Sequence, residues 1–466
     1  MSAARTAQAG QAGAHHDRWL AGLAVLAVGG GCTGALAAAA AGSTAAAAAA
    51  GAVAAAGLVV LVAAGWVDGL LVVALALPLP ALLSTEEVRI AAAAPVTAAV
   101  VAGWLLSLRP PAWPRVRGGE EERASARVRA ATLVLLGTFA VATAFASSVA
   151  ASGRELVNMA VLLTFLLVAM GRVAEPGAAD RLIAVLVLLA GACGALAVLE
   201  MIGVLPGSFP RWGTPFNRAA LGFGQPNALG LFLALMAPLA VHAAGTRRGV
   251  ARALATCALL AIVAGLFATF SRGSWLALLA GALILPVVGE RRLLVRILTG
   301  AVVLGVLLDT ASGGMLQDTA ARTLTDWVIE QRAALTLAGV LMFAAHPVVG
   351  VGPGGFALEL DRFGARIPEL WDYLPTPHNA YVQMGAEAGV MGLLAYLAFL
   401  GVCGRVLVRN AGAAAAAGAT AGEMSLRRSL LWSFATLCVA GMVVWPFSHG
   451  TGQAALLLLA VGLTRS

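Results

Sequence analysis

Long apolar runs constrain this chain more than any other feature of its sequence. A helix needs about 20 consecutive apolar residues to cross the hydrocarbon core of a bilayer. Fourteen runs reach or approach that length: 19–41, 44–64, 67–84, 88–108, 130–150, 155–171, 181–203, 219–243, 250–270, 274–289, 292–309, 378–407, 428–447 and 451–465. The two Ala-rich runs near the N-terminus and the short run at 274–289 match the pattern least well. We therefore expect 12 to 14 membrane-spanning helices.

The composition agrees with a membrane-spanning chain. Hydrophobic residues make up 60% of the 466 residues and charged residues 11%, whereas about a quarter of the residues in a soluble protein are charged. The excess apolar surface needs lipid as its solvent. The five cysteines lie inside apolar runs without metal-ligand spacing, so we interpret them as packing residues. The predicted fold class is an all-α polytopic membrane protein.

The arginines orient the predicted bundle. All 30 basic residues are Arg, and such residues accumulate in short cytoplasmic loops. If the N-terminus is cytoplasmic and the spans alternate, 21 of the 30 lie on the cytoplasmic side. The nine on the outer side are Arg89, Arg154, Arg211, Arg218, Arg272, Arg322, Arg332, Arg362 and Arg366. The net charge of +8 is then an orientation signal, and we expect no nucleic-acid partner.

This topology divides the chain into four parts. They are a cytoplasmic N-terminal tail at 1–18, a transmembrane bundle at 19–309, an external loop at 310–377 and the C-terminal part of the bundle at 378–466. Within the external loop, apolar residues recur every three or four positions over 321–345, which predicts an amphipathic helix along the outer interface. Residues 346–356 are rich in Gly and Pro and predict tight turns.

The apolar run at 378–407 opens with the most informative motif. From His378 to Gly392 the segment reads H-N-x9-G-x-x-G. At about 100° per residue of an α-helix, Gly385, Gly389 and Gly392 project within about 40° of His378. Such a glycine seam either lets a neighbouring segment approach closely or leaves a groove beside the helix for a lipid tail.

Two other features accompany this motif. They are the turn Ser271-Arg272-Gly273 between two spans and the stretch from His346-Pro347 to Gly350-Val351-Gly352. In this order, the three features resemble the O-antigen ligase and polymerase superfamily of lipid-linked glycan transferases, which includes protein O-oligosaccharyltransferases. The resemblance covers roughly residues 215–395. It implies a GT-C-like bundle of about 12 to 14 transmembrane helices with an external helical subdomain.

The resemblance also implies a reaction. A glycan would move from an undecaprenyl-diphosphate donor to an acceptor hydroxyl, with inversion, at the outer face of the bacterial cytoplasmic membrane. The acceptor is a glycan, a lipid or a protein, and the motifs do not separate ligases from polymerases. His378 would be the general base, while Arg218 and Arg272 would hold the diphosphate. Without the resemblance, His378 is also explained as a helix cap and each arginine as an anchor at the membrane edge.

Five further residues are candidates for substrate contact. Asn379 and Tyr381 belong to the histidine motif itself. Arg322 and Arg332 lie on the expected external helix, where a solvated helix face is the alternative interpretation. His449 also lies on the outer side and is the reserve candidate for the base.

Two absences narrow the chemistry. The outer segments contain no Asp-x-Asp pair, and the chain contains no Walker loop. We therefore expect no metal ion and no other cofactor, with the donor's diphosphate leaving group supplying the energy. A polytopic transporter or a lipid-linked glycan flippase is the alternative from another class. A flippase should show inverted repeats or broken helices at the midplane; the sequence shows no convincing repeat, and the candidate residues cluster at one face, which favours an enzyme.

Overall fold

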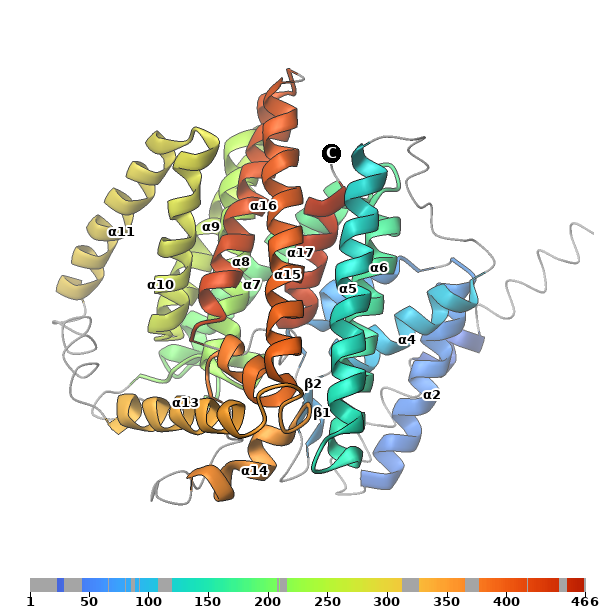
Figure 1. Ribbon diagram of the computed structural model, residues 1–466. Coiled ribbons are helices and arrows are strands. Elements are labelled where there is room, and N and C mark those ends of the chain that lie inside the picture. Colours follow the sequence, from blue (N-terminus) through green and yellow to red (C-terminus); the bar gives the residue numbers. More distant parts are fainter. Residues whose placement is uncertain are drawn as a thin grey trace, which may run out of the picture.

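The computed structural model consists almost entirely of helices (Figure 1). It describes residues 23–28, 44–65, 67–79, 81–84, 89–91, 93–107, 120–207, 209, 216–311, 327–364, 377–416, 418–443 and 451–464. The helices before residue 215 are α2 (Thr44–Ala63), α3 (Gly69–Ala76), α4 (Ala93–Leu106), α5 (Glu120–Ala144), α6 (Val149–Val173) and α7 (Ala178–Met201). The later helices are η1 (Leu221–Phe223), α8 (Pro226–Thr246), α9 (Gly249–Ala268), α10 (Arg272–Gly281), η2 (Ala282–Val288), α11 (Arg291–Ala311), α13 (Trp327–Ala345), α14 (Gly355–Gly364), α15 (Ala380–Ala416), α16 (Ala421–Ala440) and α17 (Thr451–Thr464).

Six of the described helices are long and apolar enough to cross a membrane by length and composition. They are α5, α6, α7, α8, α9 and α15, and five shorter apolar helices accompany them within the described residues. Apolar side chains remain exposed on the outside of the bundle, as on α11, where Val302 is 66% exposed. The chain is therefore a helical, multi-pass membrane protein, which confirms the fold class that the composition predicted.

The expected 12 to 14 spans exceed the six long helices among the described residues. The runs at 67–84 and 88–108 are two of the expected spans that do not form long helices. The first run forms only the eight-residue α3, because Pro78 follows its end and a proline cannot continue a helix. The chain then forms a two-stranded antiparallel pair, β1 (Ala81–Ser84) and β2 (Arg89–Ala91), and the second run continues as the 14-residue α4.

α8 lies inside the bundle, packed against α7, α9, α16 and α17 (Figure 1). Phe232, Leu233 and Leu239 on α8 are fully buried, as expected for a helix that is apolar on all sides. α7 and α9 cross with their backbones in contact, since a Cβ on Gly265 would lie 2.4 Å from the Cα of Gly194. This close crossing, one turn before α9 ends, fixes the position of the turn that follows α9.

α13 lies crosswise to the long helices at one end of the bundle, next to α14 (Figure 1). Its buried side chains are Leu335, Ala338 and Met342, spaced by three and four residues. They pack with Val351 and Phe356 in a small core of their own. The helix that apolar spacing predicted at 321–345 is thus present from Trp327 onward, and residues 321–326 lie outside the described part of the chain.

Candidate functional site

His378 occupies a sharp turn immediately before α15. Its φ of 49° places it in the left-handed region. The carboxamide oxygen of Asn379 then caps α15, accepting hydrogen bonds from the backbone N–H groups of Tyr381 at 3.0 Å and Val382 at 3.1 Å. The N–H of Ala380 donates to the carbonyl of Gly441, at 2.7 Å. These hydrogen bonds fix the first turn of α15 and so hold His378 in place directly before it.

Arg272 is the first residue of α10, after the short turn that follows α9. Within this turn the N–H of Ser271 donates to Oγ1 of Thr269 at 3.1 Å, and the hydroxyls of Ser271 and Ser274 lie 2.8 Å apart. Thr269, Ser271 and Ser274 are all buried. Buried, hydrogen-bonded hydroxyls make this turn a rigid platform for the arginine.

Arg218 contacts the same turn. Its Nε donates to the carbonyl of Thr269 at 3.3 Å, and its Nη2 donates to Oδ1 of Asn227 at 3.4 Å. The hydroxyl of Ser271 donates to that same Oδ1 at 3.0 Å. The segments that carry Arg218 and Arg272, 54 positions apart in the chain, are therefore joined through Thr269, Ser271 and Asn227.

Glu200 supports the loop that carries Arg218. Its buried carboxylate accepts hydrogen bonds from the N–H groups of Ala220 at 3.0 Å and Leu221 at 2.8 Å. This buried acid of α7 therefore has two backbone partners. Its role in the fold is to hold the start of η1 against the end of α7.

Arg332 on α13 completes the group of basic side chains. Burial first, and the positive charge of Arg332 second, lower the pKa of His378 to about 4. Burial and then the charge of Arg272 lower the pKa of Arg332 as well. The charge of Arg272 thus acts on the pKa of Arg332, and that of Arg332 acts on the pKa of His378. The starts of α10 and α15 lie at the same end of the bundle as α13 (Figure 1). Like charges placed this close repel one another, and an anion bound between them would relieve that repulsion.

Strained backbone marks the same region. Among the described residues, three other than glycine have left-handed φ angles: Leu221 at 46°, Phe270 at 48° and His378 at 49°. Each conformation of this kind costs about 1–3 kcal/mol and persists only where the surroundings impose it. The three lie beside Arg218, beside Arg272 and at the histidine itself, so the strain is concentrated where the basic side chains meet.

The glycine seam of α15 does not leave the groove that was one of its two interpretations. Gly389 breaks the helix with φ 63° and ψ −163°. A Cβ there would lie 2.2 Å from the carbonyl oxygen of Val348, and the N–H of Val390 donates to the carbonyl of Pro347 at 2.8 Å. The turn after α13 fills the space at Gly389, so close approach is the correct interpretation at this glycine. Because of the break, the angular positions expected for one continuous helix do not apply beyond it.

Backbone N–H groups of the glycine-rich turn at 346–355 and of Phe356 donate hydrogen bonds to α15. The N–H groups of Val351 and Gly352 donate to the carbonyls of Ala386 and Glu387, both at 2.9 Å. The N–H of Phe356 donates to the buried carboxylate of Glu387 at 3.4 Å. These amide groups are engaged with α15, so they are not free to donate hydrogen bonds to a phosphate.

The remaining candidates divide into two groups. The hydroxyl of Tyr381 donates to the carbonyl of Cys438 at 2.8 Å, which ties α15 to α16. Asn379 caps α15, as described above. Arg322 and His449 lie outside the described residues. The described residues contain no group of three or more His, Cys, Asp or Glu side chains placed to hold a metal ion.

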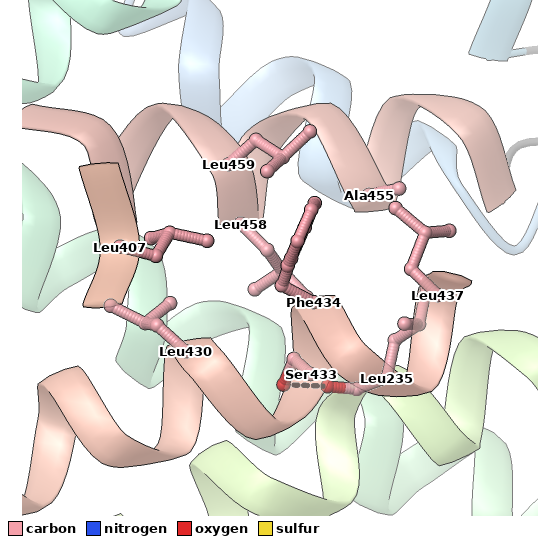
Figure 2. Close-up of a pocket in the computed structure, with 9 residues that line it drawn as sticks. All are labelled: Leu235, Leu407, Leu430, Ser433, Phe434, Leu437, Ala455, Leu458 and Leu459. Carbon is pink, nitrogen blue, oxygen red and sulfur yellow. Dashed lines mark hydrogen bonds between the residues drawn. The ribbon is translucent and has the colours of Figure 1, made fainter. Parts of the chain in front are cut away.

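A small apolar cavity lies within the bundle, away from these basic side chains. Figure 2 shows that its lining comes from α8, α15, α16 and α17, and its one polar group, the hydroxyl of Ser433, donates to the carbonyl of Leu235 at 2.8 Å. Its volume is about 10 Å³, near the minimum that a single water needs. This cavity offers no chemistry and is a packing defect of the core.

Sequence reasoning missed Asn227 and Thr269 as members of the site. Asn227 follows Pro226 at the start of α8, and nothing in the sequence there marks it as a partner of Arg218 or Ser271. Thr269 is an ordinary residue at the end of an apolar run. Neither carries a signal of its own, because each acts through the segments that the fold brings beside it.

Comparison with known proteins identifies one matching family. Residues 256–397 match the model of the O-antigen ligase family, which is less than a third of the chain. The matched segment contains Arg272, Arg332 and His378, and it leaves out Arg218 and Asn227. The chain matches none of the curated proteins compared with it.

Proposed function

We propose, from the premise that the chain belongs to the O-antigen ligase and polymerase superfamily, that it is an inverting glycosyltransferase independent of metal ions. The donor would be a glycan on undecaprenyl diphosphate, and the acceptor a hydroxyl of a glycan, lipid or protein. The chain is an O-antigen ligase-like membrane enzyme; the donor, the stereochemistry and the location of the site are what the proposal adds.

One observation carries this proposal: Arg272 and His378, at the starts of α10 and α15, gather with Arg332 at the end of the bundle that α13 crosses, close enough for charge to lower the pKa of Arg332 and of His378 (Figure 1). Two guanidinium groups can each form two-pronged hydrogen bonds to phosphate oxygens. A diphosphate between them would offset the repulsion between the two cations. The same contacts would stabilise the negative charge that grows on the diphosphate as it leaves.

The chemistry then requires one proton acceptor. His378 is outside the spanning part of α15, and its lowered pKa keeps the imidazole neutral at neutral pH. In the proposed step the acceptor oxygen forms a bond to the anomeric carbon and its proton passes to the imidazole. The bond from that carbon to the diphosphate oxygen breaks, and its electron pair leaves with the diphosphate. Binding of the anionic donor next to Arg332 would raise the pKa of His378 and make it a better base.

Arg218 has a double role in this proposal. Its Nε and Nη2 hydrogen bonds tie it to Thr269 and Asn227, so it positions the turn that carries Arg272. Its charge adds to the field that attracts the diphosphate. We therefore expect its replacement to affect donor binding, as for Arg272, and we expect the larger loss at Arg272.

The site would face away from the cytoplasm. The distribution of arginines places 21 of 30 on the opposite side, together with the tail at 1–18. The proposed external loop at 310–377 includes α13 and α14, which lie at the same end of the bundle as the starts of α10 and α15 (Figure 1). A polyprenyl-linked donor in the outer leaflet would then reach the arginines with its diphosphate at the membrane surface.

The test compares turnover and donor affinity in single variants. His378→Ala should lose about 10²–10⁴-fold in turnover with donor binding nearly intact, whereas Arg272→Ala should weaken donor binding as well. Arg272→Lys should restore only part of the loss, because a point charge cannot reproduce a two-pronged contact. Folding is checked by the yield of detergent-extracted protein.

Three outcomes would contradict parts of this account. Normal turnover in His378→Ala together with none in His449→Ala would move the base to His449. Equal donor affinity in wild type and Arg272→Ala would remove the diphosphate from this site. Full activity in every variant would make these residues structural anchors and would favour a transporter or flippase instead.

A further inference from the structure

Asn227 stands at a point where two parts of the site meet. It is the second residue of the 21-residue α8, whose first turn begins with Pro226. Its Oδ1 accepts hydrogen bonds from Nη2 of Arg218, at 3.4 Å, and from the hydroxyl of Ser271, at 3.0 Å. One carboxamide oxygen therefore joins the loop of Arg218 to the turn of Arg272.

These bonds fix which way the carboxamide of Asn227 is turned. A guanidinium group can only donate, so the atom that faces Arg218 has to be the oxygen. The NH₂ group of Asn227 must then lie on the other side of the carboxamide, where it has two N–H donors and no capacity to accept. It forms no hydrogen bond with any residue that the structure describes. Asn227 is only partly buried, so this group is open to a ligand.

The surroundings of that NH₂ group favour an anion. Arg218 and Arg272 supply positive charge, and the start of α8 adds the positive end of its helix dipole. We propose that Asn227 is a further substrate-binding residue whose NH₂ group donates to an oxygen of the donor's diphosphate. This inference rests on the proposed function and adds to it a neutral, directional contact next to the arginines.

The first experiment measures the affinity of undecaprenyl diphosphate for detergent-solubilised protein. Asn227→Ala should weaken binding about 10- to 100-fold, as expected for the loss of a hydrogen bond to a charged group. Asn410→Ala is the matched control. Asn410 is a buried asparagine whose Nδ2 donates to the carbonyl of Gly462. Both residues lie near the C-terminal ends of their helices, α15 and α17, and His378 precedes the N-terminal end of α15. Replacement of Asn410 should therefore leave the affinity unchanged.

A second experiment separates direct contact from positioning. In a background of Arg218→Ala with Ser271→Ala, both hydrogen bonds to Oδ1 are already absent. If Asn227 contacts the diphosphate, Asn227→Ala should weaken binding by about a further 10-fold in this background. No further loss would overturn the inference and leave Asn227 as a positioning residue only.

A third experiment tests Asn227→Asp as a single variant of the wild-type protein. An aspartate keeps both hydrogen bonds to Oδ1, so the melting temperature should not fall, but it replaces the NH₂ donors with a negative charge. Binding at least 10-fold weaker with the melting temperature unchanged supports the inference, and binding within twofold of wild type overturns it. Failure of the wild-type protein to bind undecaprenyl diphosphate would instead reject the proposed function.

Discussion

Replacing Arg332 by alanine should raise the pKa of His378 from about 4 toward its ordinary value. The charge of Arg332 disfavours a second positive charge on the imidazole, and its removal leaves burial as the remaining cause of the lowered pKa. Because burial is the larger cause, Arg332 accounts for less than half of the lowering from 6.5. Like charges within the roughly 4–6 Å over which one charge shifts the pKa of another, in a medium between protein and water in dielectric constant, repel by roughly 1–2 kcal/mol, or about one pKa unit.

The assay is the pH dependence of kcat/KM for the donor, which reports ionisation in the free enzyme. Wild type should lose activity on the acid side only near pH 4, because the base is inactive once protonated. Arg332→Ala should move this limb up by about one unit, in addition to raising KM. Arg332→Lys keeps the charge, so it is the matched control and should leave the limb in place.

Two results would refute the reasoning. An acid limb near 6.5 in the wild type would mean that the essential base is not a buried imidazole beside a cation. An acid limb that does not move in Arg332→Ala, or that moves to lower pH, would mean that the two side chains do not interact in the working enzyme.

Three other predictions follow from the topology, the absence of metal ligands and the break in α15. In a background without the five native cysteines, Met315→Cys should react with a membrane-impermeant maleimide in intact cells. Glu120→Cys should react only after the cells are permeabilised. The reverse result would mean that the bundle has the opposite orientation in the membrane. Transfer by purified protein should survive EDTA, and strict dependence on added Mg²⁺ or Mn²⁺ would show that metal ligands had been missed. Gly389→Ala should destabilise the fold by about 3 kcal/mol or more, because φ 63° with ψ −163° is a conformation almost confined to glycine. Gly401→Ala, at a position of the same helix with open space around it, should leave the melting temperature nearly unchanged.

The long apolar runs were predictable because hydropathy is a local property. The runs at 130–150, 155–171, 181–203, 219–243, 250–270 and 378–407 coincide with the six long apolar helices. Their ends were less predictable. α5 begins at Glu120, ten residues before its apolar run, because a helix can continue past the lipid with charged side chains in water.

The candidate site was only partly visible in the sequence. The motif at His378 and the turn at Arg272 each lie within a short stretch, so spacing was enough to find them. Arg332 was one of two candidate contacts on the expected external helix, and the sequence offered a solvated helix face as the alternative. Its importance comes from α13 lying across the end of the bundle, where packing of Leu335 and Met342 sets which side of the helix faces the histidine.

The sequence by itself determined that the chain is a membrane protein, where most of its long apolar helices lie to within a few residues, and which short motifs carry His378 and Arg272. These properties follow from hydropathy, helix-start residues and charge, all of which act over a few neighbouring positions. The tertiary structure alone decided which of those side chains meet. Arg272, Arg332 and His378 come from three elements separated by 46 residues or more, and Asn227 joins Arg218 to Ser271 only because α8 starts beside the end of α9. Contacts of this kind depend on close crossings such as that of Gly194 and Gly265, and no local pattern specifies where two helices will cross.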